Sequence, residues 1–333
     1  MEPQANKPRI YITRRIPEQA FNHLQETCEI RHWEEYDLPV PREVLEEEIE
    51  QADGIFTLLT EKIDEQLLRR AKRLKVISNM AVGYNNIDVE AATNRGILVT
   101  NTPDVLTETT ADLTFALLMA TARRLVESST FLRSGDWITW SPMLLTGQDI
   151  HGATLGIIGM GRIGEAIARR AKGFDMKLIY HNRSRKPGVE EQLGIGYVEL
   201  DELLRQADYV CVMTPYTPET HHLIGKREFS LMKHSAILIN TARGGIVDEQ
   251  ALFEALVTKR IWAAGLDVFE VEPVPLDHPL LTLPNVVTLP HIGSASIATR
   301  IKMAMLAADN LLQALRGEVP AHLVNPEALR NIK

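Results

Sequence analysis

The sequence predicts an α/β protein made of two doubly wound parallel-sheet domains, and three observations lead to this prediction. The chain has 333 residues, enough for two domains with separate cores. Short apolar runs alternate with amphipathic stretches in two successive series, which is the pattern of parallel strands covered by helices. A glycine-rich turn, GMGRIG, lies near the start of the second series, between an apolar strand and a helix.

The first series fills the first hundred residues. Proline near the start of two amphipathic stretches, Pro17 and Pro41, is typical of a helix beginning. The expected strands are 9–13, 28–33, 53–59, 74–80 and 96–101. The expected helices are 17–27, 41–52, one from Asp64 and one from Asp88.

One long helix is expected from about Asp104 to Ser134, because this stretch keeps a helical period without proline or glycine. A helix of that length exceeds what one small domain needs, so it would bridge domains or pack against a second subunit. An irregular arm with two tryptophans, Trp137 and Trp140, follows it.

The second series starts at Ala153. Its expected strands are TLGIIGMG, MKLIYHN, ADYVCVMTP, SAILINTA, AAGLDVF and NVVTLPHI. Its expected helices are 162–172 and, at the end, about 295–315. The chain order fits a second domain, 104–290, inserted into a first domain made of 1–103 and 291–333. Order alone does not prove that insertion.

Charge and hydropathy argue against a nucleic-acid-binding protein, a membrane protein and a secreted protein. The formal net charge of −8 argues against nucleic acid as the main partner. The longest apolar helical stretch, around LTFALLMATA, is too short to span a membrane, and the first residues lack the apolar core of a signal peptide. We therefore expect a soluble cytoplasmic protein without membrane partners.

The turn GMGRIG predicts a dinucleotide site. Gly159 would allow the tight turn, Gly161 would let the backbone approach a pyrophosphate, and Gly164 would let helix and strand pack closely. The start of the following helix would then supply N–H groups to the phosphates. The alternative is a purely structural glycine-rich turn.

The next strand ends without the acidic residue that holds the ribose of NAD. Asp or Glu is expected there about 20 residues after the glycines, but the stretch LIYHNRSRK has none. Arg183 and Ser184, with Asn182 and Arg185, would instead bind a 2′-phosphate through charge-assisted hydrogen bonds. The sequence thus predicts NADPH over NADH. The alternative is a solvated basic turn without a ligand.

Three polar residues follow apolar runs of the second series: Arg243, Glu272 and His291. Ligands of doubly wound sheets lie outside the carboxyl ends of the strands, so the three could converge there. A histidine can donate a proton, a glutamate can orient it, and an arginine can hold a carboxylate. This set suits reduction of a 2-oxo acid; ordinary salt bridges at loop ends are the alternative. No pair of histidines has metal-ligand spacing, so no metal is expected.

The motifs GMGRIG, INTARGGIVDEQAL, AAGLDVFEVEP and LPHIGSAS, in this order, resemble those of the D-isomer-specific 2-hydroxyacid dehydrogenase family over nearly the whole chain. Within the family the chain is most similar to glyoxylate/hydroxypyruvate reductases. The resemblance implies a Rossmann-type cofactor domain within a flavodoxin-like substrate domain, and a homodimer held through the long helix and the arm.

The resemblance also implies roles for individual residues. The catalytic set would be Arg243, Glu272 and His291. The cofactor would be bound by Gly159, Met160, Gly161, Arg162, Ile163, Gly164, Asn182, Arg183, Ser184, Arg185, Thr110, Thr214, Pro215, Thr241, Ala242, Asp267 and Gly293. The substrate would be bound by Ala81, Val82, Gly83, Arg243, His291 and Trp140, the last reaching the partner's site. A core anchor of the arm is the alternative for Trp140. Asn79 departs from the serine of many members.

The expected reactions are glyoxylate to glycolate and hydroxypyruvate to D-glycerate, with NADPH. A reductase of 2-ketogluconate or another 2-oxo sugar acid is the main alternative, because relatives share these motifs. A dinucleotide-sensing corepressor is a more remote alternative, since relatives of that kind carry long extra tails.

Overall fold

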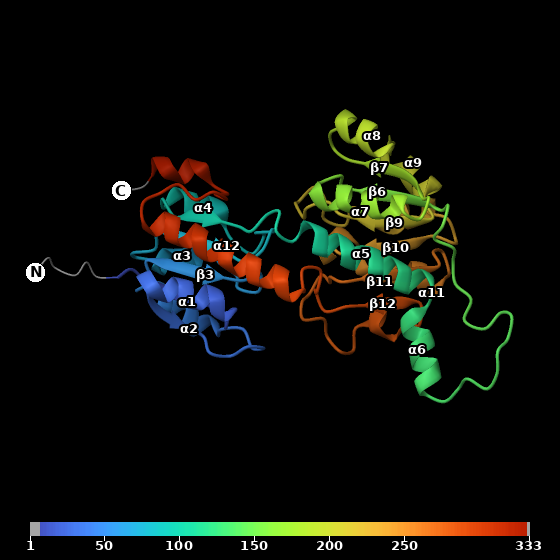
Figure 1. Cartoon of the computed structure of the whole chain (residues 1–333), viewed down its shortest axis with the longest axis horizontal. Coiled ribbons are helices and arrows are strands. Elements are labelled where there is room, and N and C mark those ends of the chain that lie inside the picture. The colour runs from blue at the N-terminus through green and yellow to red at the C-terminus, as the bar shows by residue number, and fades with distance from the viewer. Residues whose placement is uncertain (1–6, 332–333) are drawn as a thin grey trace, which may run out of the picture. The chain divides into compact units, whose positions relative to one another are not determined.

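The computed structural model describes residues 7–331, which fold into two compact units. The first comprises Met1–Leu106 and Ala295–Lys333, and the second comprises Thr107–Ser294. The chain therefore leaves the first unit once and returns to it. Figure 1 shows this return: α12 (Ile297–Leu315), near the C-terminus, lies beside α1 (Glu18–Thr27).

The first unit contains a five-stranded parallel sheet in the order β2-β1-β3-β4-β5. This is the flavodoxin-like order. The strands are β1 Arg9–Ile12, β2 Glu29–His32, β3 Gly54–Thr57, β4 Val76–Asn79 and β5 Leu98–Thr100. The other helices are α2 Arg42–Ile49, α3 Glu65–Arg70, α4 Val89–Asn94 and the short η3 Pro326–Arg330.

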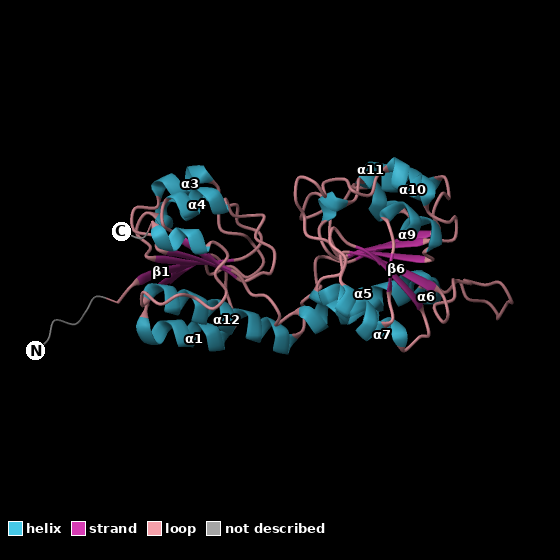
Figure 2. Ribbon diagram, turned by 90° about the horizontal axis from the view of Figure 1, so that it is seen from above, coloured by secondary structure: helices cyan, strands magenta, loops and turns pink. Residues whose placement is uncertain are grey.

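Helices cover both faces of this sheet, with α1 and α12 on one face and α3 and α4 on the other (Figure 2). Strands β3, β4 and β5 are buried along their whole length because both faces of the sheet are covered, whereas the edge strand β2 is mostly exposed. Asp64 and Asp88 cap α3 and α4 by accepting hydrogen bonds from Leu67 N and Ala91 N, which explains why those helices begin where the sequence predicts.

The second unit contains a seven-stranded parallel sheet in the order β12-β11-β10-β9-β6-β7-β8. The strands are β6 Thr154–Ile158, β7 Lys177–His181, β8 Gly196–Tyr197, β9 Tyr209–Val212, β10 Ile237–Asn240, β11 Ala263–Leu266 and β12 Val286–Thr288. Counted within the unit, this is the Rossmann order 3-2-1-4-5-6 with one further strand. The predicted fold class of two doubly wound parallel sheets is confirmed.

The helices of this unit also form two layers (Figure 2). One layer contains α5 Thr107–Ala122 and α7 Arg162–Lys172, and the other contains α9 Leu200–Gln206, α10 Lys226–Leu231 and α11 Glu249–Val257. The remaining helical segments are α6 Leu125–Arg133, α8 Pro187–Leu193, η1 Gly244–Ile246 and η2 Pro279–Thr282.

The long helix expected from Asp104 to Ser134 is two helices, α5 and α6. Arg124 lies between them in the left-handed region, with φ 52°. Its guanidinium bonds Glu127, and the returning arm supplies Gln148 N to the carbonyl of Ala122 at the end of α5. The break is set by these contacts rather than by a helix-breaking residue, since arginine is a good helix former.

The unit boundaries differ by a few residues from the expected ones. Asp104 has φ 71° and α5 begins at Thr107. His291 belongs to the second unit because its N–H donates to the carbonyl of Asp267, at the end of β11. No helix among residues 7–331 is both long and apolar enough to cross a membrane.

Candidate active site

The glycine-rich turn joins β6 to α7 and shows why Gly159 and Gly164 must be glycines. Gly159 has φ 101°, and a Cβ there would come within 2.5 Å of Thr214 N. A Cβ on Gly164 would lie 2.5 Å from the carbonyl oxygen of Gly159, so helix and turn could not approach. Gly161 faces open space at the start of α7, where the first helical N–H groups are available to an anion. These residues fit a pyrophosphate.

Only the backbone of Met160 can take part in such binding, because its side chain is fully buried in the core. Arg162 and Ile163 form the first turn of α7 and are exposed and half-buried, respectively.

A cavity of about 680 Å³ opens beside this turn, at the carboxyl ends of β6, β7 and β9. Six of the expected cofactor residues line it: Gly159, Asn182, Arg183, Ser184, Thr214 and Pro215. The sequence did not identify the other lining residues, Ile158, His181, Thr217, Glu219, Thr220 and Leu223. Most of these come from the loop after β9, and their only sequence signal is that they follow the strand next to β6.

The basic cluster after β7 divides into two kinds of residue. Arg183 lines the cavity and is exposed, and its charge acts on Glu219. Arg185 is instead held by Glu190, with Nε and Nη2 at 2.8 and 2.7 Å from its two carboxylate oxygens. Glu190 also accepts a bond from the Tyr180 hydroxyl. Arg185 was expected to bind the cofactor, but its guanidinium is already engaged.

Glu219 is an acid in the cavity that the sequence did not indicate. Its pKa is lowered, first by a hydrogen bond from the Thr217 side chain and also by the charge of Arg183. It therefore places a negative charge near Arg183, in the same cavity.

His291 and Glu272 form a close pair at the other end of the same sheet edge. Nδ1 of His291 lies 2.6 Å from Oε2 of Glu272, and Phe269 N donates to Oε1 at 3.0 Å. Burial raises the pKa of Glu272, but the His291 and Phe269 hydrogen bonds and the charge of Arg243 outweigh it, so the net pKa is lowered. The pair leaves Nε2 of His291 as the nitrogen available to a reacting group.

Asp267 holds the backbone on which His291 lies. Its fully buried carboxylate accepts bonds from Ile292 N and Gly293 N, both at 2.8 Å. Burial raises the pKa of Asp267, partly offset by the Ile292 N–H and by the charge of His291. His291 itself has φ 54°, a conformation that histidine rarely adopts without such support.

Arg243 follows β10 and is positioned by Asn240, a residue that the sequence did not single out. The Asn240 side chain donates to the Arg243 carbonyl at 2.9 Å and accepts from Ala242 N at 3.1 Å. Burial lowers the pKa of Arg243, and the negative charge of Glu272 opposes this. The buried side chain of Thr241 bonds Thr114, which also donates to the carbonyl of Thr110.

The residues described above lie along one edge of the seven-stranded sheet, in the order of the strands that precede them. His291 follows β12, Asp267 follows β11, Arg243 follows β10, Thr214 follows β9, and Gly159 follows β6. Arg183 follows β7 at the far end. Because the carboxyl ends of parallel strands share one edge, the His291–Glu272 pair lies towards one end of it, and the glycine turn and Arg183 lie further along.

A separate loop after β4 in the first unit presents two backbone donors. The carbonyls of Val82 and Gly83 accept bonds from Asn101 Nδ2 and Asn79 Nδ2, at 2.8 and 3.0 Å. Within residues 7–331, no hydrogen bond takes up the N–H groups of Val82 and Gly83. The N–H of Ala81, expected to bind substrate, donates to the Asn79 carbonyl instead. The loop can therefore bind a carboxylate through two N–H groups.

Known proteins resemble the chain closely. The model of the D-isomer specific 2-hydroxyacid dehydrogenase NAD binding domain matches residues 115–293. The chain belongs to the D-isomer specific 2-hydroxyacid dehydrogenase family. A glyoxylate reductase of Thermococcus gammatolerans is 51% identical over 328 residues, covering 97% of this chain and 98% of the relative. One of Pyrococcus furiosus is 50% identical over 328 residues, covering 97% of each.

Among solved structures, an NADPH-dependent glyoxylate/hydroxypyruvate reductase of Sinorhizobium meliloti, in complex with NADP and malonate, superposes with a TM-score of 0.85. It is 36% identical and covers 97% of this chain and 98% of that one. The chain is thus an oxidoreductase of the 2-hydroxyacid class, and its second unit is a nicotinamide-dinucleotide-binding domain.

Proposed function

We propose that the protein is an NADPH-dependent reductase of small 2-oxo acids, converting glyoxylate to glycolate and hydroxypyruvate to D-glycerate. The observation that carries the proposal is the His291–Glu272 pair, 2.6 Å apart, on the same sheet edge as the glycine turn and the cavity of Arg183. The glyoxylate reductases that share about half of its residues support the substrate class.

In this proposal a bound NADPH supplies the hydride to C2 of the oxo acid. The guanidinium of Arg243 holds the carboxylate and carbonyl side of the substrate, and the N–H groups of Val82 and Gly83 bind the carboxylate. His291 gives its Nε2 proton to the oxygen that gains negative charge. Glu272 accepts a hydrogen bond from Nδ1 of His291. This bond fixes the orientation of the imidazole ring and favours the protonated form of His291.

The remaining cofactor contacts are proposed in the same way. Gly161 and the first turn of α7 would bind the pyrophosphate, and Arg183 with Ser184 would bind the 2′-phosphate. Thr110, Thr241, Ala242, Asp267 and Gly293 would surround the nicotinamide. Arg185 is left out of this set because Glu190 holds it.

One observation favours NADH in place of NADPH as the cofactor. Glu219 lies in the same cavity as Arg183, and a carboxylate there could accept hydrogen bonds from both ribose hydroxyls of NADH. Its charge would also oppose a 2′-phosphate. NADPH remains the proposal because no acid stands at the end of β7, where Asn182, Arg183 and Ser184 follow His181.

We also propose that the protein is a homodimer held through α6 and the arm. These segments expose an unusual number of large apolar side chains, which on a monomer commonly mark an interface. The exposed residues are Leu125, Val126, Leu132, Trp137, Ile138, Trp140, Met143 and Leu144. Trp140, 75% exposed, would reach the partner's substrate.

The test of the catalytic role replaces His291 by alanine. We expect turnover to fall by roughly 10²–10⁴-fold, the usual contribution of a general acid, with NADPH binding, followed by fluorescence, nearly unchanged. His278→Ala is the matched control, because His278 pairs with Glu249 rather than with Glu272. Undiminished turnover of His291→Ala would remove this histidine as the proton donor.

A further inference from the structure

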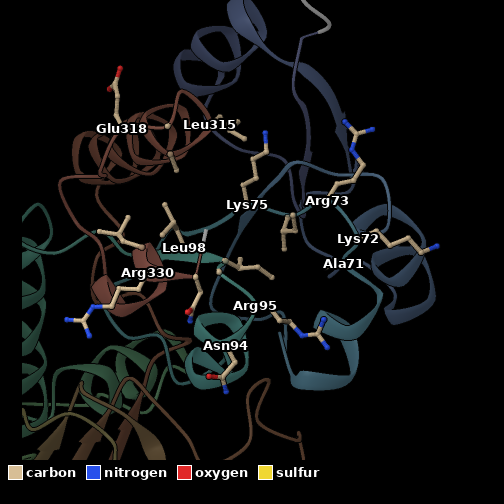
Figure 3. Close-up of a pocket in the computed structure, with 17 residues that line it drawn as sticks. Ala71, Lys72, Arg73, Lys75, Asn94, Arg95, Leu98, Leu315, Glu318 and Arg330 are labelled. Atoms are coloured by element: carbon tan, nitrogen blue, oxygen red, sulfur yellow. The ribbon is translucent and has the colours of Figure 1, made fainter. Parts of the chain in front are cut away.

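The largest cavity described in the first unit lies away from its carboxylate-binding loop. It has a volume of about 1010 Å³ and lies at the amino ends of β4 and β5, whereas the loop of Val82 and Gly83 follows the carboxyl end of β4. Its walls also include the ends of α12 and η3 (Figure 3). No role in the proposed reaction accounts for it.

The floor of this cavity is apolar and its rim is basic. Leu74, Ile97, Leu98 and Ala314 are buried beneath it. The rim contains five cationic side chains and one acidic one: Lys72, Arg73, Lys75, Arg95, Arg330 and Glu318. A basic rim of this kind stands out in a chain whose formal net charge is −8.

Three of the five cations have no ion-pair or side-chain hydrogen-bond partner among the described residues. Lys72 is paired with Glu50 at 3.1 Å, and Arg73 is paired with Asp53 at 3.1 Å. Among residues 7–331, no ion pair or side-chain hydrogen bond engages Lys75, Arg95 or Arg330. In Figure 3 these three side chains lie around Leu98 and come from three separate segments, while Glu318 points away from them.

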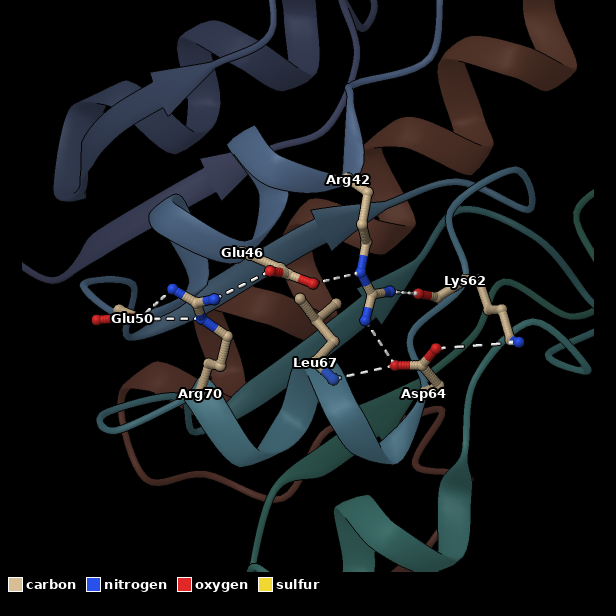
Figure 4. A network of polar contacts seen from close by, with 7 residues as sticks. All are labelled: Arg42, Glu46, Glu50, Lys62, Asp64, Leu67 and Arg70. Atoms are coloured by element: carbon tan, nitrogen blue, oxygen red, sulfur yellow. Dashed lines mark hydrogen bonds and ion pairs between the residues drawn. The ribbon is translucent and has the colours of Figure 1, made fainter.

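The neighbouring helices show that free cations are not the rule in this unit. On α2 and α3, Arg42 pairs with Glu46 and Asp64, and Arg70 pairs with Glu46 and Glu50, all within 3.0 Å (Figure 4). Cations on these two helices are thus paired with acids, whereas no ion pair within residues 7–331 includes Lys75, Arg95 or Arg330. A surface built for solubility would alternate the two signs.

We propose that this cavity binds a phosphorylated small molecule. Arginine guanidinium groups bind phosphate oxygens in a two-pronged geometry, and a lysine ammonium adds a point charge. The apolar floor would take an uncharged part of the ligand, and a volume of this size accommodates a molecule as large as a nucleotide. The site is distinct from the dinucleotide cavity, which lies in the second unit.

The experiment titrates inorganic tripolyphosphate into the full-length protein by calorimetry, with NADP⁺ at saturating concentration to fill the dinucleotide cavity. We expect saturable binding of one tripolyphosphate per chain, weakening as salt is added. The double variant Lys75→Glu/Arg95→Glu should weaken it at least tenfold. Arg15→Glu/Lys302→Glu, which changes the net charge equally on exposed cations outside the cavity, should leave it unchanged.

Absence of saturable binding, or an equal loss in both double variants, would overturn the proposal. A second measurement uses the unaltered protein, so it does not depend on the folding of a variant. Acetylation of lysines, followed by mass spectrometry, should slow at Lys75 when tripolyphosphate is added and stay constant at Lys302. Equal rates at Lys75 with and without tripolyphosphate would also contradict the site.

Discussion

At the scale of single residues, the structure separates side chains that the sequence treats alike. Arg183 and Arg185 stand two positions apart in one basic cluster, yet only Arg183 lines the cavity and Arg185 is bound by Glu190. Glu190 is five residues from Arg185 along the chain, so its partnership depends on how α8 folds back. No pattern of residue types shows that fold.

This difference gives a matched pair of variants. Arg183→Ala should raise the KM for NADPH by roughly 10–100-fold, because a charge-assisted bond to phosphate contributes about 1.5–3 kcal/mol. The KM for NADH should change little, since NADH has no 2′-phosphate. Arg185→Ala should leave both KM values nearly unchanged. Steady-state kinetics of the two variants with both cofactors make the comparison, and equal losses for NADPH and NADH would contradict the role of Arg183.

Asn79 gives a second prediction at this scale. Its Nδ2 holds the Gly83 carbonyl at 3.0 Å, so the shorter side chain of Asn79→Ser would release the carboxylate-binding loop. We expect the KM for the oxo acid to rise by roughly two- to tenfold, as for loss of one hydrogen bond of about 0.5–1.5 kcal/mol. The dissociation constant of NADPH should be unaffected. Asn94→Ser, an exposed asparagine on α4, is the control. A change in kcat alone would argue against a role in substrate binding.

At the scale of elements, strands and capped helices could be predicted, while breaks set by distant contacts could not. Asp64 and Asp88 mark helix starts because capping is local. The end of α5 depends on Gln148, which lies 26 positions beyond Ala122 and returns with the arm. Similarly, Glu219 enters the cofactor cavity from the loop after β9, which becomes a neighbour of β6 only in the folded sheet.

The loop between β11 and η2, which carries Glu272, should make stability depend on pH. The folded-state pKa of Glu272 is lowered, so its stabilising contribution is present above the ordinary carboxyl pKa of about 4.3 and is lost as pH falls through the lower folded value. The difference in melting temperature between the unaltered protein and Glu272→Gln should therefore be largest near pH 7 and should shrink below about pH 4. Thermal melts at pH 7, 5 and 3.5 measure this. A difference that grows with acidity would contradict the assigned direction.

At the scale of the whole molecule, the strand order of the seven-stranded sheet brings the residues that follow six of its strands to one edge of the second unit. The sequence could predict this edge because the rule for parallel sheets is general. It could not predict that asparagine side chains bind the carbonyls of Val82 and Gly83 after β4. Nor could it predict the unpaired cations around Leu98. Both features depend on side chains that meet only after folding.

We propose that the protein reduces small 2-oxo acids with NADPH at this edge of the sheet. The most direct measurement is steady-state reduction of glyoxylate, hydroxypyruvate and 2-ketogluconate, each with NADPH and with NADH. We predict the highest kcat/KM for glyoxylate or hydroxypyruvate with NADPH. A preference for NADH would assign the ribose to Glu219 rather than to Arg183, and a preference for 2-ketogluconate would make the protein a sugar-acid reductase. No turnover with any of the six pairs would contradict the proposed 2-oxo acid reductase activity.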